Sequence, residues 1–319
     1  MKGPGPVPVG LISNPNSGHN RDRFDRISAM VADCPSIHHL VTRSVDDIGP
    51  VLEQLASLQV KALAINGGDG TASAILGRML EGNVFRESPS IVLLPGGTAN
   101  MNAGDVGVRG KLIAAVKRLC RWSETGQGVT GTVERRLLRV HANGGNHYGM
   151  FLGAGAVMHG TEYAHREIHA RGLRDEFSLA LGTARTVWGV FRNDPRFNRH
   201  VSISLRLGDG EAASHDALIL AVSTLHRLFF GMRPFWGDEP GTLRLTLIEQ
   251  GCTRFLRTFI SIARGRPDSN AVPGSGYISH NADQLQLALQ GSLNLDGEII
   301  QAGGEVSIDT AGPLQFLRL

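Results

Sequence analysis

The chain has 319 residues, of which 41% are hydrophobic and 19% charged, a composition typical of a globular protein with ample material for a core. A formal net charge of +3 is too small to favour nucleic acid as a partner. No run of about 18 uncharged apolar residues occurs, and the first residues, MKGPGPVPVG, lack the apolar region of a signal peptide. We therefore expect a cytoplasmic protein that neither spans a membrane nor binds nucleic acid.

The first third of the chain alternates between strand and helix patterns. Strands are predicted at residues 7–13, 39–42, 61–65 and 91–94, and helices at residues 23–31, 45–58, 71–80 and 111–122. Because the connections are short, this order predicts a doubly wound parallel sheet with helices on both faces. Ligands of such sheets bind beyond the carboxyl ends of the strands, so we expect a binding site at that edge.

Three glycine-containing turns follow strands of this sheet and therefore share its carboxyl edge. They are Asn14-Pro15-Asn16-Ser17-Gly18, Gly67-Gly68-Asp69-Gly70-Thr71 and Pro95-Gly96-Gly97-Thr98-Ala99-Asn100. Glycine lets a phosphate approach the backbone, and the start of a helix presents outward N–H groups to an anion. Any one of these turns alone is ordinary turn chemistry, whereas three at one edge indicate a nucleotide site.

Asp69 is unusual in such a setting, because a carboxylate repels a bare phosphate. A hard cation with oxygen ligands reverses the local electrostatics, so we interpret Asp69 as reaching Mg²⁺ that is bound to nucleotide phosphates. The alternative is a tight turn between strand and helix in which Asp69 is only a helix N-cap.

Beyond a polar stretch at residues 123–132, the pattern changes to short β-type segments. Strands are predicted at residues 136–141, 147–152, 201–207, 216–222, 243–247, 284–289 and 298–301, and helices at residues 159–171, 177–191 and 252–263. We therefore predict two domains: an α/β nucleotide-binding domain at residues 1–125 and a mostly antiparallel, β-sandwich-like domain at residues 126–319. The extreme C-terminus is a candidate to pack back on the first domain.

Two carboxylates flank a glycine late in the second domain, in Asn294-Leu295-Asp296-Gly297-Glu298. One interpretation is a plain hairpin turn of the Asp-Gly type. The other is a general base, because an alcohol that attacks a γ-phosphate must lose its proton to a nearby carboxylate. The sequence does not separate the base from its helper.

The motifs NPNSG, GGDGT, LPGGTANMNAGDVG and NLDGE, in this order, resemble the diacylglycerol kinase catalytic family, which groups bacterial lipid kinases with sphingosine and ceramide kinases. The resemblance extends over nearly the whole chain, since FLGAG and FFGMRP are also similar to second-domain segments of that family. P-loop, dinucleotide-binding and protein-kinase motifs are absent from the sequence.

The resemblance implies an N-terminal domain related to phosphofructokinases and NAD kinases, with ATP in a cleft, Mg²⁺ on its phosphates and a lipid hydroxyl as acceptor. By matching positions, it also implies which residues line the ATP site: Asn14, Pro15, Asn16, Ser17, Gly18, Thr42, Gly67, Gly68, Asp69, Gly70, Thr71, Ala72, Ser73, Gly97, Thr98 and Asn100. Asp296 and Glu298 match the catalytic carboxylates.

The sequence departs from the family pattern at two positions. Met101 stands where the family usually has an Asp beneath the phosphates. Pro240 stands where the family often has an Asp that holds a structural Mg²⁺, and Pro offers no side-chain oxygen. Asp238 is the candidate that would compensate as a metal ligand.

A kinase that acts on bilayer lipid needs a docking surface, so we expect peripheral association with the inner membrane surface. Residues 254–266 combine five large apolar side chains with flanking arginines, as interfacial helices do. Residues 185–199 interleave Trp and Phe with arginines and are a second candidate. For both segments the alternative is a helix packed on the core with solvated arginines.

Two other functions fit parts of the sequence. One is a kinase for a soluble acceptor such as NAD, whose family shares GGDGT. The other is a nucleotide- or lipid-binding module that has lost catalysis, which Met101 would suggest and the retained Asp69, Asp296 and Glu298 oppose. The sequence decides neither which lipid is phosphorylated nor whether the chain forms a homodimer.

Overall fold

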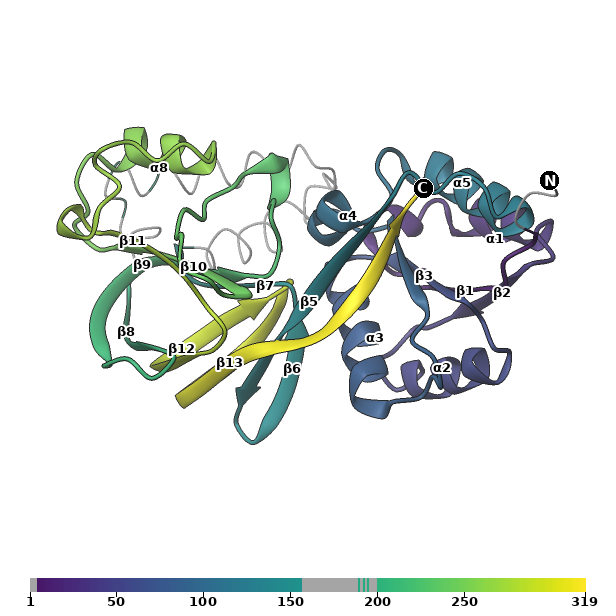
Figure 1. Cartoon of the computed structure of the whole chain (residues 1–319), viewed down its shortest axis with the longest axis horizontal. Helices are drawn as coiled ribbons and strands as arrows, with labels where there is room; N and C mark the ends of the chain where they lie inside the picture. The colour runs from purple at the N-terminus through teal and green to yellow at the C-terminus, as the bar shows by residue number, and fades with distance from the viewer. Residues whose placement is uncertain (1–4, 157–188, 190–191, 193, 195–199) are drawn as a thin grey trace. The chain divides into compact units, whose positions relative to one another are not determined.

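The computed structural model describes residues 5–156 and 200–319, together with positions 189, 192 and 194 (Figure 1). The chain divides into two compact units, Met1–Arg135 with Gly312–Leu319, and Arg136–Ala311. The helices predicted at residues 159–171 and 177–191, and the basic aromatic segment 185–199, fall almost wholly outside the described residues.

The first unit contains a parallel sheet in the order β2-β1-β3-β4. Its strands are β1 (Val9–Ser13), β2 (Ile37–Val41), β3 (Ala62–Gly67) and β4 (Ser90–Pro95). β1 and β3 are fully buried because helices cover both faces, which explains their near-continuous apolar sequences. The end of β13 (Glu298–Arg318) adds a further parallel strand, with Phe316 opposite Ile91 of β4.

Helices cover the two faces of this sheet in pairs (Figure 1). α1 (Phe24–Ala32) and α5 (Leu112–Thr125) pack on one face through a core that includes Ile27 and Leu119. α2 (Ile48–Ser57) and α3 (Asp69–Gly82) contact each other and cover the opposite face. The predicted doubly wound α/β fold is therefore confirmed for this unit.

The order of the strands places a topological switch point between β1 and β3. The chain moves from β1 to β2 on one side, whereas β3 and β4 lie on the other side of β1. Crossover helices on opposite faces leave the carboxyl ends of the two strands open at such a point, which is where doubly wound sheets bind ligands.

One helix of this unit, α4 (Met101–Val106), was not predicted from the sequence. Its six residues are too few to show a helical period in their apolar positions, and Gly104 lies within them. Asn100, in the left-handed conformation with φ of 47°, turns the chain into this helix.

The second unit is built of antiparallel strands. They are β5 (Gly131–Ala142), β6 (Gly145–Gly149), β7 (Phe151–Gly155), β8 (Val201–Leu207), β9 (Ala213–Ser223), β10 (Leu243–Glu249), β11 (Tyr277–Ala282), β12 (Leu285–Leu295) and most of β13. β7 and β8 each pair with both β9 and β12, so these four strands close on one another.

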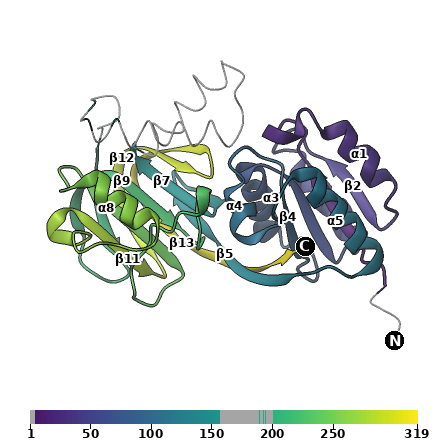
Figure 2. The same ribbon diagram turned by 90° about the horizontal axis from the view of Figure 1, so that it is seen from above.

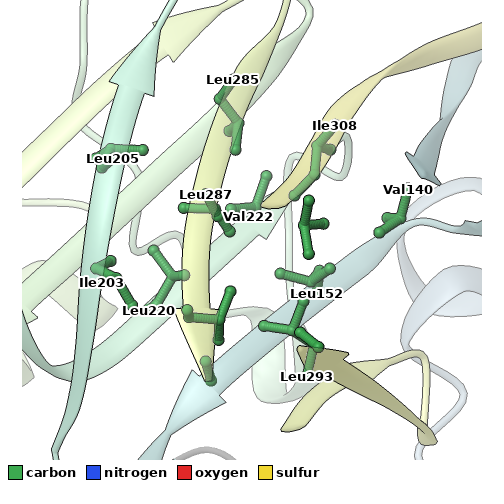
Figure 3. Packing of buried hydrophobic residues seen from close by; sticks show 14 of the residues in the cluster. Val140, Leu152, Ile203, Leu205, Leu220, Val222, Leu285, Leu287, Leu293 and Ile308 are labelled. Carbon is green, nitrogen blue, oxygen red and sulfur yellow. The ribbon is translucent and has the colours of Figure 1, made fainter. Parts of the chain in front are cut away.

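A continuous apolar core lies inside this set of strands (Figure 3). Leu205 of β8, Leu220 of β9, Leu152 of β7 and Leu287 of β12 all belong to it and are at most 5% exposed. Alternate residues of β12 point into this core, in the burial pattern of a strand with one wet face. The predicted antiparallel, strand-rich character of the second domain is confirmed.

The length of β13 differs most from the prediction. The sequence indicated a strand only at residues 298–301, but β13 runs for 21 residues and pairs with β12 from Glu298 to Ile308. Gly303 and Gly304 weaken the sequence signal, because glycine lacks a side chain that fits a pleated surface.

Among the described residues, no helix is both long and apolar enough to cross a lipid bilayer.

Candidate nucleotide-binding and catalytic site

The three glycine-containing turns meet at the carboxyl edge of the parallel sheet, as their sequence positions predicted. The backbone N–H of Asn14 donates to the carbonyl of Asn66, at 3.0 Å, and that of His19 donates to the carbonyl of Gly96, also at 3.0 Å. Backbone hydrogen bonds therefore connect the two ends of the first turn to the second turn and to the third turn.

Glycines allow the turns to approach at backbone distance. A Cβ placed on Gly97 would lie 2.5 Å from the Cα of Gly68, and one placed on Gly18 would lie 2.5 Å from Oγ1 of Thr98. Real Cβ atoms do not come this close to other heavy atoms, so Gly97 tolerates no side chain while the turns keep their places. The second and third turns form one surface only because both carry glycine at the contact.

Hydroxyl and amide side chains connect the first two turns. Asn14 Nδ2 donates to Thr71 Oγ1 at 3.0 Å, and the hydroxyl of Ser17 lies 3.4 Å from the same oxygen. The N–H of Gly68 donates to Ser17 Oγ at 3.2 Å. Helix α3 starts at Asp69, so its first N–H groups and the positive end of its dipole lie among these polar side chains.

The carboxylate of Asp69 bonds to the start of α4. Its Oδ2 accepts the N–H of Met101 at 3.0 Å, and its Oδ1 accepts the N–H of Asn102 at 2.9 Å. Asp69 thus caps the next helix along the chain, where its negative charge is stabilised by the helix dipole and by two charge-assisted bonds. The charge that looked out of place in an anion-binding turn is largely offset by α4.

Asp69→Asn is expected to destabilise the protein by about 1–3 kcal/mol, because the amide NH₂ would face one of the two N–H donors that the carboxylate now accepts. Urea denaturation measures this effect. The control is Asp22→Asn, an exposed carboxylate for which about 0.5 kcal/mol or less is expected. Equal denaturation midpoints for the two variants would contradict the capping role.

The remaining predicted ATP-site residues differ in their exposure. Thr42 is 3% exposed at the end of β2, where its N–H donates to the carbonyl of Ser13 at 3.0 Å. Ala72 and Ser73 are buried inside α3, and Asn16 is exposed at the tip of the first turn. Gly67 and Gly97 are buried. The other predicted positions are half-buried: Pro15, Gly18, Gly68, Gly70, Thr98 and Asn100.

Asn100 holds the third turn in shape. Its Oδ1 accepts the N–H of Gly97 and its Nδ2 donates to the carbonyl of Gly97, both at 2.8 Å. This reciprocal pair orients the turn between β4 and α4 and occupies the amide group that the sequence suggested for ligand contact. Asn100 therefore shapes the turn, whatever else it contacts.

In the second unit, Asp296 is tied to the backbone of the neighbouring strand. Its Oδ2 accepts the N–H of Met150 at 2.7 Å and its Oδ1 accepts the N–H of Phe151 at 3.1 Å. The side chain is 7% exposed, and a Cβ on Gly149 would lie 2.9 Å from Oδ2. Asp296 itself has a φ of 49°, so two bonds from its side chain stabilise an otherwise unfavourable turn conformation.

Glu298 is different, because it stands exposed at the start of β13. Partial desolvation by the surrounding protein atoms raises the pKa of Glu298, and the negative charge of Asp296 raises it further, while His147 lowers it. A carboxylate with a raised pKa is a better proton acceptor near neutral pH. The structure thus separates the two acids, with Asp296 bonded to the backbone and Glu298 open to a proton donor.

Comparison with known families bears directly on the three turns. Residues 8–128 match the sequence model of the diacylglycerol kinase catalytic domain, a range that contains all three. This part of the chain is therefore similar to the catalytic domain of diacylglycerol kinases. None of the curated proteins compared matches the chain.

Solved structures share the fold along the whole chain. A candidate diacylglycerol kinase from Bacillus anthracis str. Sterne superposes with a TM-score of 0.68 and 17% identity, covering 99% of this chain and 96% of that one. A diacylglycerol kinase from the same organism gives a TM-score of 0.62 and 17% identity, covering 97% and 96%. Yeast NADH kinase, complexed with NADH, gives 0.51 and 11% identity, covering 98% and 84%.

The Met101 departure from the diacylglycerol kinase pattern affects the side chain but not the backbone. The N–H of Met101 still donates to Asp69, and the thioether is 7% exposed. The connection between the second and third turns is therefore made by the main chain, which any residue except proline supplies at position 101.

The segment around Pro240, where the sequence suggested a metal ligand, contains a hydrogen-bonded pair of side chains. Glu239 pairs with His280, and its Oε2 also accepts the N–H of Asn281 at 3.1 Å. The bond to His280 is the main cause that lowers the pKa of Glu239 to about 2. Asp238 is exposed, and the described residues contain no group of three metal-ligating side chains, so the Asp238 site stays a prediction.

Sequence reasoning missed the polar layer beneath the turns. Asn20 and Asn66 are both 0% exposed; Asn20 Nδ2 donates to the carbonyls of Asn14 and Asn66 at 2.8 and 2.9 Å. Asn66 Nδ2 donates to Ser13 Oγ at 3.1 Å, and Ser13 Oγ lies 2.9 Å from Nε2 of His39, whose pKa is lowered by burial. The available signal was a polar residue, Ser13 or Asn66, ending each apolar strand.

Proposed function

We propose that this protein is a lipid kinase that transfers the γ-phosphoryl group of ATP to a lipid hydroxyl. The observation that carries the proposal is the backbone contact of the glycine turns, in which Gly97 lies against Gly68 and Gly18 against Thr98. A surface of glycines and hydroxyls at the start of a helix suits a chain of phosphates, because nothing projects from it to block their approach. The matched family supports the reaction class.

The turns would bind and orient the phosphates. The side chains of Asn14 and Ser17 both bond to the hydroxyl of Thr71, so these groups are already held in place before a ligand arrives. Such preorganisation removes most of the entropy cost of aligning the γ-phosphoryl group with an acceptor. Phosphoryl transfer depends mainly on this positioning and on charge stabilisation.

Mg²⁺ fits this set of donors through the phosphates of ATP. Each carboxylate oxygen of Asp69 accepts one backbone N–H, and the carboxylate would also hold the cation directly or through a water bound to it. When bound, the cation would neutralise negative charge that develops on the transferring group. Asp69 is the one residue of the turns that offers it a charged ligand.

Glu298 is the proposed general base. The acceptor hydroxyl would give its proton to Glu298 while its oxygen forms a bond to the γ-phosphorus, and the bond from that phosphorus to the leaving ADP oxygen breaks. The raised pKa of Glu298 suits this role. Asp296, with both oxygens bonded to the backbone, would position the turn and its charge would keep the pKa of Glu298 high.

A panel of acceptors in the presence of labelled ATP and Mg²⁺ tests the proposal. We expect label in the chloroform-extractable product with one of diacylglycerol, a sphingoid base, ceramide or phosphatidylglycerol, and none on NAD. Mass spectrometry of the product identifies the lipid. Label on NAD alone would favour the soluble-acceptor kinase, and nucleotide binding without transfer to any acceptor would favour a binding module.

A further inference from the structure

Figure 2 shows helix α8 (Phe255–Ala263) in the second unit. The apolar residues of this helix lie on two different sides of it. On the inner side, Phe255, Phe259 and Ile262 pack on a core that includes Tyr277 of β11. These three account for most of the apolar residues that the sequence offered for membrane contact. The core-packed alternative is therefore correct for the inner side of this helix.

The outer side of α8 keeps apolar residues away from the core. Ile260 is 41% exposed, and Leu256 lies one turn before it on the same line of the helix. Arg264 follows one turn after Ile260 and is exposed. An exposed stripe of this kind, with apolar residues next to arginine, is not needed to stabilise the fold.

A second exposed apolar residue belongs to the short helix η3 (Phe229–Gly231). Phe230 is 55% exposed and has a φ of 56°, a left-handed conformation that is a genuine outlier for a bulky residue. Its ring packs edge-on against that of Phe229, with centroids 5.5 Å apart. Backbone strain that presents an aromatic ring to solvent is typical of a binding surface.

The two elements are neighbours. The N–H of Arg233, just after η3, donates to the carbonyl of Ala263 at the end of α8, at 2.9 Å. A Cβ on Gly265 would lie 3.1 Å from Cβ of Arg233. The exposed apolar residues of η3 and α8 therefore occur on two segments that are bonded to each other, and we name them, with their arginines, the α8 patch.

The charge of the α8 patch has one sign. Residues 225–236 and 251–267 contain no Asp or Glu. Their arginines are Arg227, Arg233, Arg254, Arg257, Arg264 and Arg266, all of them exposed. Arg257 forms a long ion pair with Asp268, at 3.7 Å. Six exposed arginines on the two segments that carry the exposed Phe230 and Ile260 match the requirements of an anionic lipid surface.

We propose that the α8 patch docks the protein on anionic lipid bilayers, with Phe230, Leu256 and Ile260 entering the headgroup region and the arginines contacting lipid phosphates. The inference rests on the proposed function, since a lipid kinase must reach its acceptor at a surface. A bilayer fits better than a protein partner, because the apolar residues are few and scattered among arginines instead of forming a broad hydrophobic core.

Co-sedimentation with vesicles tests the patch. We expect the wild-type protein to bind phosphatidylcholine vesicles that contain phosphatidylglycerol and to bind vesicles of phosphatidylcholine alone far more weakly. Arg264→Gln with Arg266→Gln is expected to weaken binding by about 30-fold, because each basic residue near an anionic surface contributes about 1 kcal/mol. High salt should weaken the wild type in the same way.

Apolar insertion is tested by Phe230→Asn and Ile260→Gln. Asn tolerates the left-handed conformation of residue 230, so the turn should survive while the ring is lost. The matched controls are Leu58→Gln, which has the same 41% exposure as Ile260 but lies after α2, and Arg86→Gln, an exposed arginine of the first unit. We expect each patch variant to bind vesicles about 10-fold more weakly than the wild type. The control variants should bind them as the wild type does.

Two outcomes would overturn the docking surface. One is vesicle binding by the patch variants that equals that of the controls. The other is a wild type that self-associates in solution through this patch and ignores vesicles, which would assign the patch to a second copy of the chain. Phosphoryl transfer to lipid in detergent micelles is measured in parallel; its absence in the wild type contradicts the kinase proposal while the vesicle result still decides the surface.

Discussion

Glu298→Gln is expected to lower the turnover of lipid phosphorylation by about 10²- to 10⁴-fold, the usual contribution of a general base. The substituted amide cannot accept the proton of the attacking hydroxyl. Binding of ATP should be unchanged, because the glycine turns belong to a different unit of the chain. Turnover with labelled ATP and calorimetric titration of ATP measure the two effects separately.

The pH dependence of the wild type adds a second test of Glu298. Its pKa is raised, so the base form is lost at a higher pH than for an ordinary glutamate, and turnover should fall as the pH drops through that raised pKa. The same shift means that the ionised side chain slightly opposes folding above its pKa, so Glu298→Gln should leave stability unchanged or increase it at neutral pH.

Two comparisons make the Glu298 result specific. Glu305→Gln removes an exposed carboxylate from the same strand and should leave turnover at the wild-type value. Asp296→Asn should instead lower stability, because its oxygens accept the N–H groups of Met150 and Phe151. Wild-type turnover in Glu298→Gln would show that the base lies elsewhere.

Gly97→Ala is the second change with a large expected effect. Its methyl group would lie 2.5 Å from the Cα of Gly68, so the second and third turns must separate. Overpacking of this kind costs about 1–3 kcal/mol, which corresponds to about 5- to 150-fold weaker ATP binding if the bound state requires the turns in contact. Calorimetric titration of ATP into the folded variant measures the loss.

Gly104→Ala is the matched control for that experiment. Gly104 lies in α4, only a few residues further along, and a Cβ there meets nothing within 4 Å. Because alanine is favoured over glycine inside a helix, this variant should gain about 0.5–1 kcal/mol of stability and bind ATP as the wild type does. Equal ATP affinity in Gly97→Ala and Gly104→Ala would contradict the phosphate-binding role of the turns.

Sequence reasoning succeeded where the signal is local. The apolar strands that end in Ser13, Gly67 and Pro95 are short and bounded by turn residues, so their alternation with helices predicted a parallel sheet and the edge where their turns meet. The resemblance to the diacylglycerol kinase family was carried by those turns, and the matched range, residues 8–128, contains them.

The same reasoning failed where the structure depends on partners far along the chain. β13 is stabilised by its pairing with β12 and, at Phe316, with β4, and the local propensity of its glycine-containing sequence is low. α4 is too short to be read from periodicity, yet its first N–H groups hold Asp69. In both cases tertiary contacts stabilise an element that its own sequence only weakly specifies.

What the sequence by itself determined is the order of strands and helices, the shared edge of the glycine turns and the pair of acids in NLDGE, because each follows from spacing along the chain. Only the tertiary structure decided what the carboxylates do. The oxygens of Asp69 and Asp296 accept backbone N–H groups, while Glu298 is exposed and its pKa is raised by desolvation and by the charge of Asp296. Hydrogen-bond partners more than 30 residues away in sequence make that difference, and no local pattern encodes them.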